Sequence, residues 1–178
     1  MRSTTPALRL TLPLITAAAV IAAAPSPSDH AHRSGPPWIS IEYPANPLDG
    51  STRGAYLLVH AFHHGTPAQA PVRGTAEGLV GGERKSITLR FETTSRPGVY
   101  ALRKQWADDG VWSLLISVEQ HENDLAQALV EIGADGGITS VRVPTRAQGS
   151  WTFPRRVTAQ ELEQSLQSRA TRTAQARR

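Results

Sequence analysis

Histidine is the residue type best suited to chemistry in this chain, and three of its six histidines lie close together, at His60, His63 and His64. Neutral imidazole binds Zn and Cu(II), in sites where three or four ligands converge at about 2 Å from the metal. Two further histidines, His30 and His32, lie in an N-terminal stretch of Pro and Ser and could add ligands. The cluster predicts a candidate Cu(II) or Zn site made by His60, His63 and His64.

Whether these side chains converge depends on the element that carries them, residues 55–64, AYLLVHAFHH. Tyr, Val and Phe favour a strand here. On a strand, His60 and His64 share a face about 13 Å apart and His63 points to the other face. The three would then be ordinary side chains of a strand face and a loop. If the strand instead ends at Phe62, a metal site could still form. On a helix, by contrast, positions i, i+3 and i+4 share one face and could converge.

The usual catalytic arrangements are not found in the sequence. Asp108 and Asp109 are adjacent, so they cannot face each other across a cleft as paired glycosidase carboxylates do. The chain has no G-x-S-x-G motif, and its Gly-rich stretch 71–85 lacks the G-K-[ST] of a P-loop. We therefore expect a protein that is not an enzyme, with no cofactor other than a possible Cu(II) or Zn ion.

The N-terminus resembles an export signal. Arg2 and Arg9 precede an apolar run, Leu10 to Ala24, that ends in small residues. This pattern predicts a cleavable signal peptide at 1–24 and a periplasmic or extracellular protein. The alternative is an uncleaved anchor, but the run has about 15 residues, and about 20 are needed to cross a bilayer. We therefore expect no integral membrane span after cleavage. The chain has no Cys, which excludes disulfides, thiolate metal sites and a lipoprotein anchor.

The net charge of +4 is unevenly distributed. Residues 25–154 contain 11 Lys and Arg against 13 Asp and Glu, whereas residues 155–178 contain 6 Arg against 2 Glu. A nucleic-acid-binding domain needs a basic face with interleaved aromatic residues, which the central region lacks. We therefore expect no nucleic acid among the partners. An unknown protein or a component of the cell envelope is expected, and the basic tail could contact the envelope.

Short alternating apolar segments separated by Gly, Pro and Asp fill the central region, as in an antiparallel β-sandwich. In residues 111–118, Trp112, Leu114, Ile116 and Val118 share one face. The Asp-Gly at 109–110 predicts a β-hairpin between 99–106 and 111–118. Residues 84–92 are expected to form one strand, and 126–132 with 137–144 a second hairpin. Residues 69–80, broken by Pro and Gly, predict a poor strand or a bulged edge strand.

These segments predict four regions in the chain. After the signal peptide come a flexible arm at 25–37, a sandwich of about seven strands at 38–154, and an amphipathic helix with a basic tail at 155–178. The helix is expected at about 159–169, because Thr158 and Glu161 form a capping box. The tail beyond it, which contains little that is apolar, is expected to fray. Trp151 and Phe153 are expected to pack on the sandwich.

The order of the central motifs resembles the FixH/YtkA-like group of extracytoplasmic immunoglobulin-like domains. The resemblance rests on a strand with a G-x-P turn, a second strand, a G-x-Y and a G-x-W, at 55–67, 72–74, 87–91, 97–100 and 110–118. It implies an immunoglobulin-like sandwich and a small binding or accessory module; some relatives are tied to metal transport or oxidase assembly. The chain has no Met after Met1, so a Cu(I) site of that kind is not predicted. The alternative function is a periplasmic metal-handling protein that uses the histidine cluster.

Overall fold

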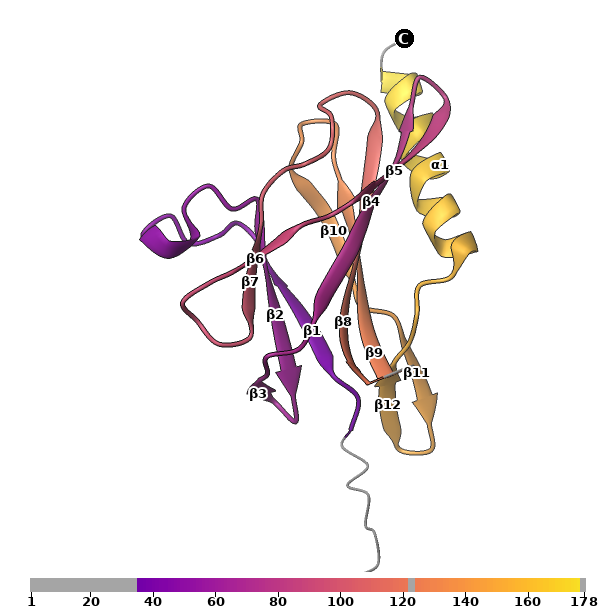
Figure 1. The fold of residues 1–178 in the computed structure, drawn as a ribbon. Helices are drawn as coiled ribbons and strands as arrows, with labels where there is room; N and C mark the ends of the chain where they lie inside the picture. The colour runs from indigo at the N-terminus through magenta and orange to yellow at the C-terminus, as the bar shows by residue number, and fades with distance from the viewer. Residues whose placement is uncertain (1–34, 122–123, 177–178) are drawn as a thin grey trace, which may run out of the picture. The chain divides into compact units, whose positions relative to one another are not determined.

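The protein is described by a computed structural model that covers residues 35–121 and 124–176 (Figure 1). The predictions of a signal peptide at 1–24 and of most of the arm at 25–37 concern residues outside this part. The described residues form one compact unit. Its described residues are mainly β-strands in antiparallel sheets, with one C-terminal helix, so the predicted β-sandwich is confirmed.

Two five-stranded sheets face each other. Sheet A has the order β1-β2-β7-β6, with β3 paired to β2, and sheet B has the order β10-β9-β8-β4-β5. The bounds of sheet A are β1 Trp38–Glu42, β2 Leu57–His63, β3 Thr66–Pro67, β6 Phe91–Thr93 and β7 Val99–Leu102. Those of sheet B are β4 Val72–Val80, β5 Glu83–Thr88, β8 Val111–His121, β9 Asp124–Ile132 and β10 Ile138–Arg142. A separate hairpin pairs β11 Thr145–Gln148 with β12 Trp151–Pro154, a short 3-10 helix η1 spans Gly50–Thr52, and α1 spans Ala159–Ala176.

The core lies between the two sheets and follows the period of two read from the sequence. Leu57, Val59 and Ala61 of β2 point into it from sheet A. From sheet B, β8 contributes Trp112, Leu114, Ile116 and Val118, as predicted, and each is less than 5 % exposed. Trp106, in the connection between β7 and β8, is 6 % exposed and packs in the same core.

The prediction of a β-hairpin across Asp109-Gly110 is wrong. β7 pairs with β2 and β6 in sheet A, whereas β8 pairs with β4 and β9 in sheet B. The chain crosses from one sheet to the other after Leu102, and the buried Trp106 fills the space beneath the crossing. The Asp-Gly pair therefore ends a sheet-to-sheet connection, and its local preference for a turn is satisfied there as well as in a hairpin.

The predicted strand at 84–92 also crosses between the sheets. β5 belongs to sheet B and β6 to sheet A, so one continuous alternation of apolar residues runs through two strands of different sheets. The facing was predicted correctly, because Ile87, Leu89 and Phe91 all contact the core. A continuous alternation fixes which side chains point inward, but it does not distinguish one long strand from two that join facing sheets.

Strand β4 is neither the poor strand nor the bulged edge strand expected from its glycines. It lies inside sheet B, paired to β8 on one side and β5 on the other. A Cβ added at Gly78 would lie 2.6 Å from the Trp112 ring, and one at Gly74 would lie 2.7 Å from the Leu115 carbonyl oxygen. Glycine at these two positions leaves room for a large ring and for a neighbouring backbone, both of which approach this strand closely.

Helix α1 begins at Ala159 as predicted but extends to Ala176, beyond the expected end near Arg169. The capping box is formed: the Glu161 amide donates to Thr158 Oγ1 at 3.1 Å, and the Thr158 amide donates to Glu161 Oε2 at 2.8 Å. Figure 1 shows α1 beside sheet B, where Leu166 is fully buried. Arg169, at the predicted end, is buried against the sheet, a contact that local sequence does not reveal.

Candidate functional site

The three clustered histidines lie on β2 and in the turn that follows it. His60 is on the outer face of sheet A, where its Nε2 lies 2.8 Å from Glu42 Oε2 on the neighbouring strand β1. Its ring stacks on Phe62, with centroids 6.1 Å apart. His60 is therefore engaged in a strand-to-strand contact, away from the face to which His63 belongs.

His63 and His64 lie against each other, with ring centroids 4.2 Å apart. His63 ends β2, and its buried Nε2 has no hydrogen-bond partner within the described residues. His64 has a positive φ of 50°, and its Nε2 accepts from the Gly35 amide at 3.3 Å. Across residues 35–121 and 124–176, no group of three His, Asp or Glu side chains could hold a metal ion. The structure thus brings together two of the three predicted ligands and leaves His60 apart.

A cavity lies elsewhere, at the end of sheet B next to the C-terminal half of α1. It measures about 460 Å³. We call it the helix groove; three segments line it, the β7–β8 connection, the β9–β10 turn and α1, through Asp108, Asp109, Ala134, Thr139, Arg172 and Thr173. It forms because the β8–β9 pairing begins at Ser113 and Glu131, and beyond that pair the two strands separate.

Arg169 of α1 forms one wall of the groove and is only 6 % exposed. Its Nη1 donates to the carbonyl oxygens of Trp112 at 2.7 Å and Ile132 at 2.8 Å, the first residues beyond the β8–β9 pairs. Its Nε donates to the Ser165 carbonyl at 3.0 Å, and its Nη2 donates to the hydroxyls of Ser113 and Ser165. The guanidinium thus replaces the missing ladder bonds and fixes α1 to the sheet.

Burial is the main influence on the charge of Arg169. Loss of solvent lowers the pKa of its guanidinium, while Glu131, whose Oε2 lies 3.9 Å from Nε, opposes that shift. Arg172, one turn further along α1, lowers the same pKa by repulsion. The side chain remains charged at neutral pH, because an arginine starts from a very high pKa.

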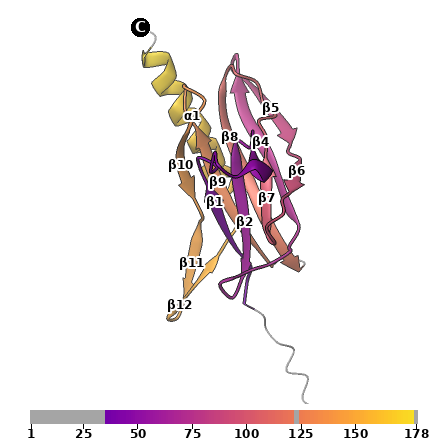
Figure 2. The same ribbon diagram turned by 90° about the vertical axis from the view of Figure 1, so that its left-hand side faces the viewer.

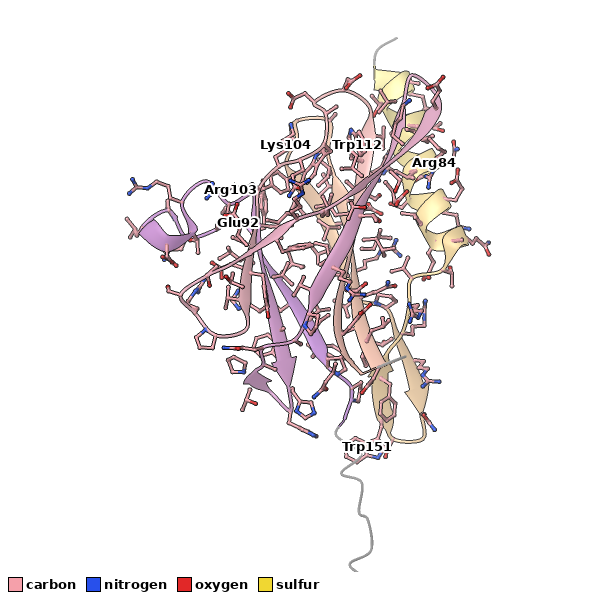
Figure 3. The ribbon with its side chains drawn as sticks, in the orientation of Figure 1. Arg84, Glu92, Arg103, Lys104, Trp112 and Trp151 are labelled. Atoms are coloured by element: carbon pink, nitrogen blue, oxygen red, sulfur yellow. The ribbon has the colours of Figure 1, made fainter. Side chains whose placement is uncertain are left out.

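The loops that border the groove are held in place by hydrogen bonds. The Trp112 indole Nε1 donates to the Asp109 carbonyl oxygen at 2.8 Å. In the β9–β10 turn, the Gly133 amide donates to the Gly137 carbonyl at 2.7 Å, and the Tyr56 hydroxyl donates to the Gly136 carbonyl at 2.7 Å. Figure 3 shows Trp112 and Lys104 near this end of the sandwich. The groove is therefore largely preformed.

Two opposite charges border the groove without an ion-pair partner in the described part of the chain, the Asp109 carboxylate and the Arg172 guanidinium. Asp108 differs, because Lys104 forms a salt bridge with it. Sequence reasoning rejected Asp108 and Asp109 as a catalytic pair and did not find the groove. The sequence indicates the groove through one feature, the spacing of Leu162, Leu166 and Arg169. This spacing places an arginine on the buried face of the helix.

No helix in the described ranges is long and apolar enough to cross a membrane. Comparison with family models, with curated proteins and with solved structures finds no match to this chain. The resemblance to FixH/YtkA-like domains therefore stays a prediction, and the argument for function depends on the geometry of the sites.

Proposed function

We propose that this chain is an exported, non-enzymatic, immunoglobulin-like binding module, and that the helix groove is where its ligand binds. The observation that carries the proposal is the pair of unpartnered charges, Asp109 and Arg172, bordering one cavity of about 460 Å³. A preformed cavity of a few hundred Å³ with a few convergent polar groups is typical of small-ligand sites. Export is supported by the sequence pattern at 1–24, and the immunoglobulin-like assignment by the motifs at 55–118.

The groove favours a small dipolar ligand, such as an amino acid or a short peptide with free ends. A carboxylate of the ligand can pair with the Arg172 guanidinium, which presents a planar fork of donors. An ammonium group can pair with the Asp109 carboxylate. Thr173 supplies a hydroxyl that donates or accepts along the wall. The Thr139 hydroxyl donates to the Glu131 carbonyl oxygen at 3.3 Å and can still accept. Arg169 adds positive charge but no free donor, because its N–H groups are already bonded to the protein.

The test is a calorimetric titration with amino acids and unblocked di- and tripeptides, against the same peptides acetylated at the N-terminus and amidated at the C-terminus. Unblocked peptides should bind to the wild type, and blocked peptides should not. Asp109→Asn and Arg172→Gln should each weaken binding about tenfold or more. Arg146→Gln, on a hairpin away from the groove, is the matched control and should leave the affinity unchanged. Equal affinity for blocked and unblocked peptides would refute the proposed ligand class.

A second candidate function, metal handling, is favoured by one observation. The buried Nε2 of His63 lacks a hydrogen-bond partner in the described residues, beside the ring of His64. An unpaired buried imidazole nitrogen is costly unless something binds it, and a Zn or Cu(II) ion would do so. His60 is the least suited of the predicted ligands, because Glu42 occupies its Nε2.

Zinc and Cu(II) titrations of the wild type and of the His63→Ala, His64→Ala double variant test this second candidate. The double variant should lose at least about tenfold in metal affinity, because each imidazole is a direct ligand. His60→Ala serves as the control and should bind metal like the wild type. If the wild type and the double variant bind equally, the metal function is wrong.

A further inference from the structure

The β11–β12 hairpin stands apart from both sheets of the sandwich. Its two strands pair only with each other, Thr145–Gln148 against Trp151–Pro154. The base of the hairpin is anchored, because Pro154 is buried and the Val157 amide, just beyond β12, donates to Gln127 Oε1 on β9 at 2.8 Å. Figure 2 shows the hairpin extending past the lower end of sheet B. A fixed base with a free tip is suited to contact with something outside the protein.

The exposed face of this hairpin combines aromatic and basic side chains. In the antiparallel register, Gln148 is opposite Trp151 and Arg146 is opposite Phe153, so these four residues share one face. Trp151 is 72 % exposed, which contradicts the prediction that it packs on the sandwich. Figure 3 shows it at the end of the hairpin. An exposed Trp beside an exposed Arg is the combination found at membrane–water interfaces.

The charge of the surrounding segment is entirely positive. From Ile138 to Gln160 there are four arginines and no Asp or Glu. Arg142 pairs with Glu131 and Arg155 with Glu161. Arg146 and Arg156 are exposed and have no ion pair within the described residues. Arg146, on the same hairpin face as Trp151, and Arg156, just beyond β12, favour a negatively charged surface.

The hairpin tip lies at the same end of the sandwich as the start of β1, as Figures 1 and 2 both show. Gly35 is held there by its amide contact with His64, in the turn after β2.

We propose that the β11–β12 hairpin docks this protein on the surface of an anionic phospholipid bilayer, with Trp151 at the headgroup level and Arg146 on the phosphates. This goes beyond the proposed ligand site, because the helix groove uses different residues and another element. The docking is electrostatic and interfacial, so it does not require a spanning helix. It is reversible and sensitive to salt, because the charges lie at the surface and are screened by ions.

The experiment is vesicle co-sedimentation of the exported form, from Pro25 to Arg178, which contains the whole compact unit. Vesicles of phosphatidylcholine with 25 mol% phosphatidylglycerol, chosen as about a quarter anionic lipid, are compared with pure phosphatidylcholine. The wild type should bind the anionic vesicles, and 0.5 M salt, where the screening length is only about 4 Å, should release it. Trp151→Ala with Arg146→Gln should lower the partition coefficient about tenfold or more, since one surface arginine alone contributes about fivefold.

Two further variants separate docking from a loss of folding or of net charge. Leu48→Ala with Arg53→Gln removes one exposed apolar and one exposed basic side chain from the loop around η1, where Leu48 is 91 % exposed. This matched control should partition like the wild type. Arg146→Lys keeps the charge and should also bind. The proposal fails if the wild type does not bind anionic vesicles or if the hairpin variant binds them like the wild type. It also fails if the η1 variant loses as much binding as the hairpin variant.

Discussion

The Nη1 of Arg169 donates a 2.7 Å hydrogen bond to the carbonyl oxygen of Trp112, joining helix α1 to the core strand β8 at the point where β8 and β9 separate. The same residue, Trp112, faces the core with its ring and lies against Gly78. One contact therefore connects the sandwich core, the C-terminal helix and the wall of the helix groove. The stability of the groove should depend on it.

Replacing Arg169 with Ala should destabilise the protein by about 3 kcal/mol, because buried carbonyl oxygens and serine hydroxyls lose their donor. Denaturant unfolding at neutral pH measures this change in the free energy of unfolding. Arg172→Ala, one turn away and exposed, is the control and should change that free energy by no more than about 0.5 kcal/mol. Equal effects of the two substitutions would mean that the buried network does not hold the helix.

The Arg155–Glu161 pair at the start of α1 predicts a dependence of stability on pH. Hydrogen bonds from the Arg155 guanidinium, at 2.7 and 2.8 Å, and then from the Thr158 amide hold the pKa of Glu161 well below its usual range. A carboxyl with a depressed folded pKa contributes stability above its unfolded pKa, and this contribution is lost as the pH falls towards the folded value.

Glu161→Gln should therefore be less stable than the wild type at pH 7, and the difference should shrink below about pH 4, the range of a free glutamate. Thermal unfolding of both proteins between pH 7 and pH 2 measures it. The carboxylate of Glu163, two residues away, pairs with Arg84 at 3.4 Å and accepts from Gln167 Nε2 at 2.8 Å, both at the surface. Glu163→Gln should therefore show a smaller difference at pH 7. A Glu161→Gln difference that stays constant with pH would contradict the assignment.

The position of Gly78 on β4, under the Trp112 ring of β8, predicts a steric effect of substitution. Gly78→Ala would place a Cβ 2.6 Å from the Trp112 ring, so either the ring or the strand must move. Overpacking of this kind costs about 1–3 kcal/mol. Gly50→Ala is the matched control, because no heavy atom lies within 4 Å of its added Cβ. Urea unfolding measures the stability of both variants. If Gly78→Ala were as stable as Gly50→Ala, the packing explanation would be wrong.

Much of the fold could be predicted because it depends on local pattern. The alternation in β8, the strand β2, the hairpin of β9 and β10, and the capping box of Thr158 and Glu161 all follow from neighbouring residues. The failures concern partners that are distant in the chain. Asp109-Gly110 favours a turn but does not specify which strands flank it, and Gly78 appears to weaken β4 until the Trp112 ring is placed over it.

The functional sites were less predictable for the same reason. Strand alternation correctly indicated that His60 would be separated from His63, because the period of two is local. The helix groove depends on where α1 crosses the end of sheet B, which is decided by the contacts of Arg169 with Trp112 and Ile132. Trp151 is exposed because its hairpin leaves the sandwich, and nothing in residues 145–154 distinguishes that from a packed hairpin.

The central claim is that the helix groove binds a small dipolar ligand. The most direct measurement is a two-dimensional amide NMR titration of the labelled protein with an unblocked tripeptide. The account predicts saturable shifts at groove residues, among them Gly110, Ala134 and Thr173, with no shifts at the turn of His64 and Gly65. Saturable shifts centred on that turn or on the β11–β12 hairpin, with the groove residues unmoved, would contradict it.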